Sequence, residues 1–197
     1  MPAQPAKKQT PNRKNDGLTV ISPTALACYA YVWKARPSLK DGGDPQYSVT
    51  LVFPKGTDLT KLRDAAKKAA ALKWGAQFPS GLKTPFHNGD KERPDDPLFK
   101  GTTYLTARTN QKPGIVDNDV QPILDEMEFY SGCKCRASLY ANAYDQKGGK
   151  GVSFLLNNIQ KLADGTRLSG RKSAEEDFGA ADGENAEDFD DDNEDPF

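Results

Sequence analysis

The sequence predicts a mainly β domain, built as a small closed barrel of five strands with one inserted helix and long loops. Three observations favour this fold class. Short segments of alternating apolar and polar residues recur along the chain, clusters of Gly, Pro, Asn and Asp separate them, and only one segment has clear helical spacing. A β-sandwich is the alternative, because periodicity does not distinguish the two arrangements.

Two segments in the N-terminal third are typical of a hairpin. In residues 26–33 (LACYAYVW), Tyr29, Tyr31 and Trp33 alternate, so we expect them to share one face of a strand. Residues 47–53 (YSVTLVF) alternate in the same way, and the turn formers of residues 40–45 connect the two segments.

One helix is expected after this hairpin, from Leu59 to near Gly75. Thr57 or Asp58 is placed to cap its first turn. The apolar stripe is narrow, which predicts packing against a sheet or a barrel end. Its spacing follows Leu59, Leu62, Ala66, Ala69 and Lys73. The next segment, residues 78–100, is too long for a simple turn and is expected to be functional or mobile.

The second half of the chain predicts further strands. Residues 101–109 alternate, with Thr102, Tyr104, Thr106 and Arg108 on one face. Residues 115–116 and 123–124 are short apolar pieces, residues 151–156 form a strand, and residues 157–162 form a final short strand or turn. Residues 133–144 have a small apolar face that suits the inside of a barrel: Cys133, Cys135, Ala137, Leu139, Ala141 and Ala143.

Charge divides the chain into a basic body and an acidic tail. Residues 173–197 contain 12 acidic and no basic residues, a net charge of −12. The preceding residues hold 27 basic and 16 acidic side chains, a net charge of +11. We therefore expect a flexible basic arm (residues 1–16), a folded domain (17–172) and a disordered acidic tail (173–197). A basic body indicates a polyanionic partner.

Cofactor and membrane chemistry are not expected. The three cysteines, Cys28, Cys133 and Cys135, are too few for a structural zinc site unless the lone His87 joins them, so no metal or other cofactor is predicted. No apolar run is long enough to span a bilayer, and residues 1–16 lack the apolar segment of a signal peptide. These features predict a cytoplasmic protein without a membrane partner.

The sequence offers little support for catalysis. A phosphate-binding glycine loop and a nucleophile elbow are both absent. A metal-dependent nuclease or resolvase is the alternative function, because clustered carboxylates can hold two metal ions. The candidates are Asp117, Asp119, Asp125, Glu126 and Glu128. No Lys or His base is spaced with them, so we predict that the protein is not an enzyme.

Cations and aromatic rings interleave on three predicted strands. Unpaired bases stack on aromatic rings while Lys and Arg follow the phosphates, so this pattern indicates single-stranded nucleic acid. A duplex hides its base faces. The predicted contact residues are Lys134, Arg136, Tyr140 and Tyr144 on one strand, Tyr104 and Arg108 on a second, and Tyr29, Tyr31, Trp33, Lys34 and Arg36 on a third.

Five segments together give the chain a family resemblance. They are residues 29–33 (YAYVW), 47–55 (YSVTLVFPK), 86–90 (FHNGD), 132–138 (GCKCRAS) and 151–160 (GVSFLLNNIQ). With them, the chain resembles bacteriophage single-stranded-DNA-binding proteins of the OB-fold kind. The resemblance implies an OB barrel, binding to single-stranded DNA without base preference, and roles in DNA replication, recombination and repair. Duplex DNA is expected as a weaker ligand.

The C-terminal end of the chain is similar to the acidic, aromatic-ended tails of phage and bacterial single-stranded-DNA-binding proteins. This likeness implies that the tail contacts replication or recombination proteins. We expect it also to compete with DNA for the basic body. The predicted partner-binding residues are Asp190, Asp191, Asp192, Glu194, Asp195 and Phe197.

Overall fold

The structure is a computed structural model that describes residues 17–37, 43–146 and 148–168. The predicted arm and the predicted acidic tail lie outside the described residues. The strands are β1 (Thr19–Ile21), β2 (Ala25–Arg36), β3 (Gln46–Phe53), β4 (His87–Asn88), β5 (Thr103–Thr109), β6 (Gly114–Val116), β7 (Lys134–Gln146) and β8 (Gly149–Ala163). The helices are α1 (Thr60–Trp74), α2 (Gly89–Glu92) and the 3-10 helix η1 (Pro97–Phe99).

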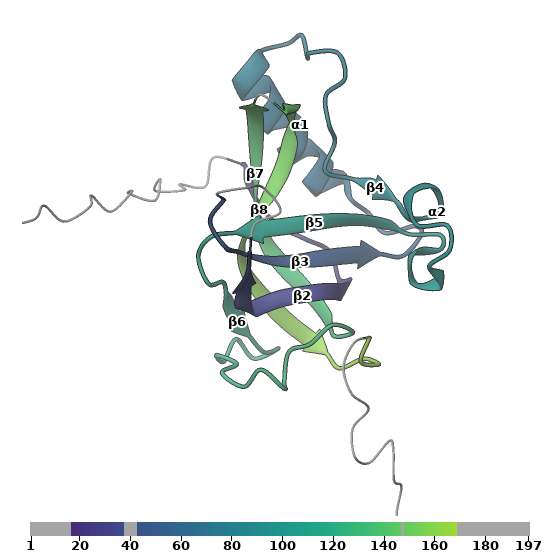
Figure 1. The fold of residues 1–197 in the computed structure, drawn as a ribbon, viewed down its shortest axis with the longest axis vertical. Helices are drawn as coiled ribbons and strands as arrows, with labels where there is room; N and C mark the ends of the chain where they lie inside the picture. Colours follow the sequence, from purple (N-terminus) through teal and green to yellow (C-terminus); the bar gives the residue numbers. More distant parts are fainter. Residues whose placement is uncertain (1–16, 38–42, 147, 169–197) are drawn as a thin grey trace, which may run out of the picture.

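Five strands close into a barrel in the order β2–β3–β5–β8–β7, with β7 pairing back onto β2 (Figure 1). All neighbours in this ring are antiparallel except β5 and β8, which are parallel. The short strands β1, β4 and β6 extend the sheet from β7, β5 and β8. The predicted five-stranded barrel is therefore confirmed, and the sandwich alternative is wrong.

The inward face of β7 is small and apolar, as its alternation predicts. Cys135, Ala137, Leu139 and Ala141 are all buried, as is Cys133 just before the strand. Larger side chains from the other barrel strands fill the remaining space: Leu51 and Phe53 from β3, Leu105 from β5, and Phe154 and Leu156 from β8. Small residues on one wall thus leave room for bulky residues on the facing walls.

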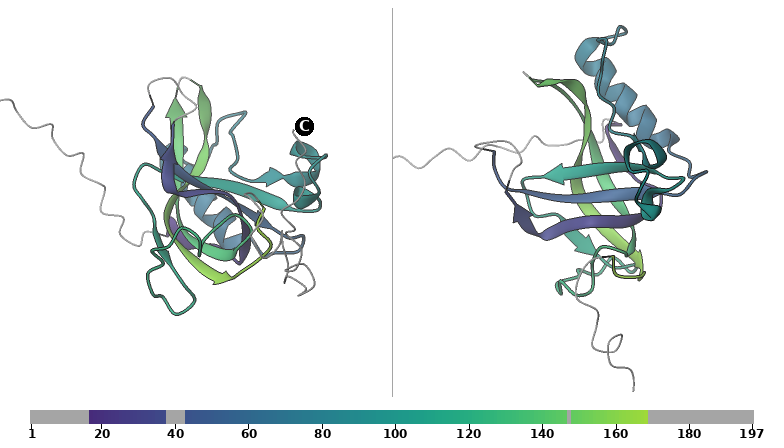
Figure 2. Two further views of the ribbon diagram at one scale, coloured as in Figure 1. Left: turned by 60° about the horizontal axis from the view of Figure 1, so that its bottom comes forward. Right: turned by 45° about the vertical axis from the view of Figure 1, so that its right-hand side comes forward.

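Helix α1 follows its prediction closely. The helix begins at Thr60, one residue later than predicted, and its N-cap residue, Leu59, provides no side-chain cap. The Thr60 N–H donates to Asp58 Oδ1 at 2.9 Å, so Asp58 satisfies one N–H group of the first turn. The buried stripe of Leu62, Ala65, Ala66, Ala69 and Ala70 contacts β1, β7 and β8, and Figure 2 shows α1 beside the projecting β7–β8 hairpin. The predicted stripe ran on to Lys73, but this residue is exposed because its turn of α1 lies at the free end of the helix.

Strand β8 is longer than predicted. The sequence predicted a strand over 151–156 followed by a separate short element, but β8 continues through both. Ser138 pairs with Asn158 and Leu139 with Leu156, so Asn157 is an extra residue that bulges without ending the strand. Two other expectations differ in detail. Strand β1 was not predicted, and residues 123–124 form no strand, although the Ile123 N–H donates to the Ile115 oxygen.

A bulge interrupts β2 and corrects the predicted alternation of its aromatic residues. Cys28 pairs with Thr50, whereas Tyr31 pairs with Ser48, so β2 has one residue more than β3 in this interval. Tyr29 lies at the bulge with φ +48°, a left-handed conformation. The sequence predicted that regular alternation puts Tyr29 and Tyr31 on one face, but the bulge between them breaks this alternation. Val32 is the buried residue that faces the core.

Residues 87–102 form an ordered clip over one end of β3 and β5. The sequence predicted one long functional or mobile loop over residues 78–100, and within it the structure has the short elements β4, α2 and η1. Phe99 is fully buried and forms a second, smaller core with Cys28, Val52 and Tyr104. Gly89 lies so close to the Phe99 carbonyl that a Cβ atom there would be 1.9 Å from its oxygen. The clip is therefore held by the buried ring of Phe99 and by a close contact between the Gly89 and Phe99 backbones that only glycine allows.

Candidate nucleic-acid interface

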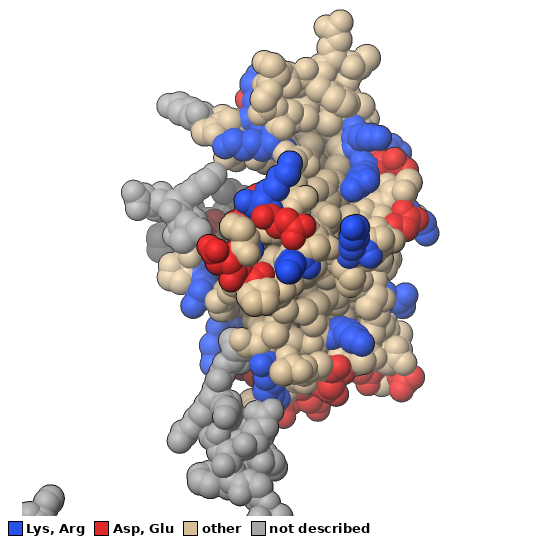
Figure 3. All heavy atoms as spheres, turned by 90° about the vertical axis from the view of Figure 1, so that its right-hand side faces the viewer, with Lys and Arg blue, Asp and Glu red and all other residues tan. Residues whose placement is uncertain are grey.

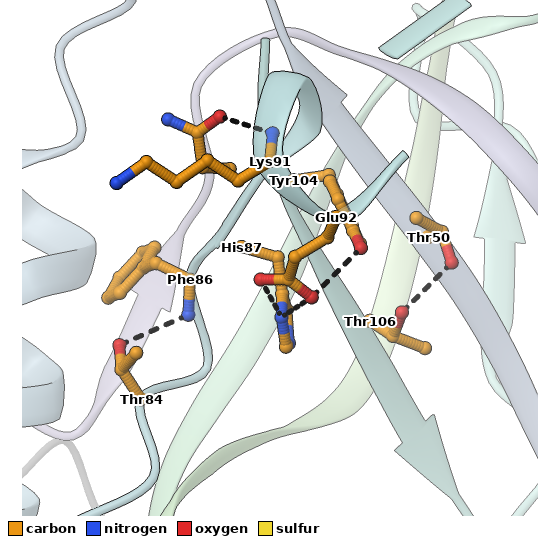
Figure 4. Close-up of polar contacts among 9 residues, drawn as sticks. Thr50, Thr84, Phe86, His87, Lys91, Glu92, Tyr104 and Thr106 are labelled. Carbon is orange, nitrogen blue, oxygen red and sulfur yellow. Dashed lines mark hydrogen bonds and ion pairs between the residues drawn. The ribbon is translucent and has the colours of Figure 1, made fainter. Parts of the chain in front are cut away.

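The outward side of β2, β3 and β5 forms a shallow floor of small polar side chains, which we call the outer face. Register places Thr50 beside Thr106 and Ser48 beside Arg108. The Thr50 and Thr106 hydroxyls are 3.0 Å apart (Figure 4). On the β2 side, Tyr31 continues the row of Ser48. Thr50 itself is buried, whereas Ser48 and Thr106 are partly exposed, and these short side chains allow extended chain segments to approach the sheet closely.

Arg93 lies at the clip end of the outer face, among aromatic rings. Its Nη1 donates to the Tyr29 hydroxyl at 2.8 Å. Its Cζ is 4.5 Å from the ring centre of Phe99, 5.0 Å from Tyr29 and 5.6 Å from Tyr104. Burial acts to lower the pKa of Arg93, but the hydroxyls of Tyr104 and Tyr29 outweigh it and raise the pKa above its ordinary value. The guanidinium is thus a fixed positive charge held against rings.

A polar network supports this cluster from the clip side. His87 Nδ1 is 2.8 Å from one Glu92 oxygen and 2.9 Å from the other, and the Tyr104 hydroxyl donates to Glu92 at 3.4 Å (Figure 4). The His87 and Tyr104 rings stack with centres 5.1 Å apart. Tyr104 is buried, so its ring supports the site and does not present an open stacking face.

The opposite end of the outer face also pairs a cation with a ring. Arg36 Cζ lies 3.8 Å from the ring centre of Tyr31, and both Arg36 and Arg108 are exposed. The floor therefore has an aromatic ring and an arginine at each end. Rings offer stacking surfaces to unpaired bases, and the arginines offer charge to phosphates.

Two other predicted residues of β2 lie away from this floor. Trp33 Nε1 donates to the Phe129 oxygen at 2.9 Å, and Lys112 Nζ lies 5.4 Å from the Trp33 ring centre. Lys34 forms an exposed ion pair with Glu126 at 3.5 Å. Both residues thus face the segment before β7, at the far end of β2.

The predicted residues of β7 form a separate surface. Strand β7 neighbours neither β3 nor β5 in the ring, so its outward side faces another direction (Figure 1). Lys134 and Arg136 are exposed, and Arg136 Nε donates to Gln160 Oε1 at 2.6 Å. Tyr140 is half-buried against the core, and Tyr144 is half-buried near the β7–β8 turn. The structure thus divides the predicted contacts between two faces.

The last described residues run past the clip end of the site. The Leu168 N–H donates to the Ser131 oxygen at 2.9 Å. Leu168, Tyr29 and Cys28 line one open cavity of about 590 Å³ together with Asp96, Pro97, Leu98 and Ser131. The predicted tail residues 190–197 lie outside the described residues, and the last described residue, Leu168, lines the same cavity as Tyr29.

The carboxylates of the nuclease alternative are engaged in local contacts. Asp117 Oδ1 accepts the N–H groups of Asp119 and Gln121, and Asp125 Oδ1 accepts that of Met127. Within the ranges that the structure describes, no group of three or more His, Cys, Asp or Glu residues is placed to hold a metal ion. In the same ranges, no helix has both the length and the apolar character that crossing a membrane requires.

Arg93, Thr50 and Thr106 are site residues that no pattern in the sequence predicted. Arg93 lies in a segment without periodicity, so nothing places it on a face. The two threonines lie on strands whose pairing is needed to bring them together. The one usable signal was Tyr104, whose alternation put it on the outward side of its strand, where Arg93 approaches.

Comparison with known proteins gives a consistent result. The family model described as "Enterobacter phage Enc34, ssDNA-binding protein" matches residues 19–190. No curated protein matches the chain. Among solved structures, the chain is similar to the single-stranded-DNA-binding protein from bacteriophage Enc34 in complex with ssDNA, with 22% identity, a TM-score of 0.70, and coverage of 83% of this chain and 100% of that one.

A second solved structure has the same architecture. It is gp2.5, a single-stranded-DNA-binding protein encoded by bacteriophage T7, with 19% identity, a TM-score of 0.57, and coverage of 79% of this chain and 97% of that one. These matches identify the barrel as an OB fold. Because the family model spans most of the sequence, the chain belongs to the non-enzymatic family of the single-stranded-DNA-binding protein of Enterobacter phage Enc34.

Proposed function

We propose that this protein binds single-stranded DNA without base preference and coats it during phage DNA replication, recombination and repair in the host cytoplasm. The observation that carries the proposal is Arg93, which is fixed among aromatic rings at one end of a polar strand floor. A flexible single strand can follow this floor and stack bases at its ends, whereas a duplex cannot expose its bases. OB folds bind oligonucleotides on the corresponding strands.

The division of candidate residues suggests an order of importance among them. Tyr29, Tyr31, Arg36, Arg93 and Arg108 surround one floor and form the primary contact surface. The β7 residues Lys134, Arg136, Tyr140 and Tyr144, with Trp33 and Lys34 of β2, are proposed as secondary contacts where a longer strand continues around the barrel. Tyr104 contributes by holding Arg93.

The acidic tail completes the proposed function. Residues 173–197 carry −12 against the +11 of the preceding chain. The tail starts at Ser173, five residues after Leu168, and Leu168 lines the same cavity as Tyr29, so the tail is tethered near the proposed DNA surface. We propose that it competes with DNA there, and that DNA binding frees it for replication or recombination proteins.

The test is a titration of labelled dT, dA and dC oligonucleotides with the full chain, followed by fluorescence anisotropy at several salt concentrations. We expect similar affinities for the three sequences and a steep loss of affinity with salt, because bound cations displace counterions from phosphates. An unlabelled duplex of equal length should compete weakly. Salt-independent binding, or equal competition by the duplex, would refute the proposal.

A further inference from the structure

Residues 117–128, between β6 and β7, form an exposed loop that is both apolar and acidic; we call it the acidic loop. Three large apolar side chains are strongly exposed on it: Leu124 is 86%, Val120 65% and Met127 64% accessible. The same twelve residues contain five carboxylates and no basic side chain: Asp117, Asp119, Asp125, Glu126 and Glu128. Exposed apolar residues gathered on one loop indicate a contact with another macromolecule.

The acidic loop holds a defined conformation while it exposes these side chains. The Asp117 N–H donates to the Gln121 oxygen, and the Asp117 carboxylate accepts the N–H groups of Asp119 and Gln121. Val120 has φ +64°, a conformation that is costly for a β-branched residue. The hydrogen bonds therefore fix the loop with its apolar residues outward. A preformed loop loses less conformational entropy when it docks.

A complementary groove lies between α1 and residues 78–86. It has a volume of about 390 Å³. Its apolar part includes Leu82, Phe86 and Phe78, the last of which is 48% exposed. Its rim carries Arg63, Lys67 and Lys83. The groove is thus apolar and basic where the acidic loop is apolar and acidic.

The two surfaces lie at opposite ends of the molecule. Gln160 of β8 donates to the Asp117 oxygen at the acidic loop, and Val152 of the same strand lines the groove. Eight residues of extended strand separate them, about 26 Å at 3.3 Å per residue. In Figure 1 α1 is at the top and the loop beyond β6 at the bottom, and in Figure 3 acidic side chains gather at the lower edge.

We propose that the acidic loop of one copy of this chain docks into the α1 groove of the next copy, so that neighbours bound to one DNA strand join head to tail. The charges and apolar surfaces match, and the distance prevents the contact within one copy. A contact between two different patches leaves one of each free and therefore extends into a row. Neither patch includes the outer face, so DNA and neighbour are bound together. The inference rests on the proposed single-stranded-DNA binding.

The test uses one variant of each surface in the full chain. The loop variant is Leu124→Ser, and its matched control is Leu72→Ser, another exposed leucine (68%) that does not line the groove. The groove variant is Arg63→Glu with Lys67→Glu. Its control, Lys61→Glu with Lys68→Glu, has the same charge change on exposed α1 residues outside the groove.

Binding is compared on an oligonucleotide that holds one copy and on one that holds two. Both surface variants should bind the short oligonucleotide like their controls but lose about tenfold or more of the cooperativity on the long one, the scale expected when a central contact is removed. An equal mixture of the two variants retains one intact loop and one intact groove, so it should recover cooperative pairs of one copy of each. Mass photometry should then show two-copy complexes at a protein concentration at which neither variant alone forms them.

Cooperativity that survives both variants, or a mixture that does not recover it, would overturn the proposal. Deleting residues 173–197 should leave the cooperativity intact; its loss, with the loop variant unaffected, would instead place the acidic tail in the groove. If the wild-type chain fails to bind the short oligonucleotide, the proposed function itself fails, and this result is separate from the other outcomes.

Discussion

Arg93 and Tyr29 are 64 residues apart in the sequence and meet through a hydrogen bond of 2.8 Å between Nη1 and the phenol oxygen. The contact joins the clip to the bulge of β2. The left-handed conformation of Tyr29 turns its side chain outward, where it is 42% exposed, and Arg93 covers part of it. The bulge of β2 and the irregular segment that carries Arg93 thus combine into one cationic aromatic site.

Replacing Arg93 by alanine should weaken binding to single-stranded DNA, because it removes both a charge and the planar group held against Phe99. We expect a loss of about 1–3 kcal/mol and a salt slope smaller by about one unit. Arg93→Lys should restore the slope but only part of the affinity, since an ammonium group does not stack as a guanidinium does. Anisotropy titrations at several salt concentrations measure both quantities.

Lys100→Ala is the matched control for Arg93, because Lys100 is an exposed cation of the same clip. It should reduce the salt slope and lower the affinity less than Arg93→Ala does, because no ring contact is lost. If Arg93→Ala and Lys100→Ala behave alike, Arg93 acts as a general charge and the aromatic site has no special role.

Gly89→Ala should disturb the site without unfolding the barrel. A Cβ atom at Gly89 would lie 1.9 Å from the Phe99 oxygen, so the clip has to move and carry Arg93 with it. We expect weaker DNA binding with a thermal midpoint close to that of the wild type, because the main core does not include the clip. Gly148→Ala, where nothing lies within 4 Å, is the control and should change neither. Normal DNA affinity of Gly89→Ala would contradict the role assigned to the clip.

The barrel could be predicted from the sequence because the patterns that indicate its strands and helix each lie within one short segment. In the structure, residues 134–141 alternate between buried and at least partly exposed, and the apolar residues of α1 are buried at helical spacing. Both patterns depend only on which side chains need burial. The site depends on relations between distant segments. The bulge at Tyr29 follows from the mismatch between β2 and β3, and the position of Arg93 follows from the burial of Phe99 beneath the clip. Neither relation leaves a periodic signal.

Tyr31→Ala should cost more DNA affinity than Tyr140→Ala. Tyr31 lies in the row of Ser48 on the outer face, beside Arg36, whereas Tyr140 is on β7 and half-buried against the core. We expect a loss of about 1–3 kcal/mol for Tyr31→Ala if a base stacks there. Anisotropy with a short dT oligonucleotide measures the difference, after circular dichroism has shown that both variants fold. A larger loss for Tyr140→Ala would move the primary contact surface to β7.

Two buried thiols should make stability depend on alkaline pH. Burial raises the pKa of Cys28 and of Cys135 to about 12 in the folded protein. In the unfolded chain a thiol ionises near its ordinary pKa of about 8.5. Each protonated thiol therefore contributes fully to the free energy of unfolding below that pH. This contribution is lost as pH rises toward 12, by about 1.4 kcal/mol per pH unit for each thiol.

Urea unfolding at pH 8 and pH 10 measures this effect. The wild type should lose more free energy of unfolding between the two values than a variant with Cys28→Ala and Cys135→Ala, although the variant starts lower because its core has cavities. The same slope in both proteins would show that the thiols do not cause the pH dependence.

Deleting residues 173–197 should raise the affinity for single-stranded DNA at low salt. The tail starts five residues beyond Leu168, which shares a cavity with Tyr29, and tethering of this kind gives an effective concentration of order mM. Its 12 carboxylates then compete with phosphates for Arg93, Arg36 and Arg108. The contact is between exposed charges, which salt screens beyond about 8 Å at physiological ionic strength, so the gain on deletion should shrink as salt rises.

The measurement is a salt series of anisotropy titrations of the full and shortened chains. A control chain that keeps all 25 tail residues but carries Gln or Asn at the 12 acidic positions should behave like the deletion, because charge and not length causes the competition. Equal affinity of the full and shortened chains at low ionic strength would show that the tail does not occupy the DNA surface.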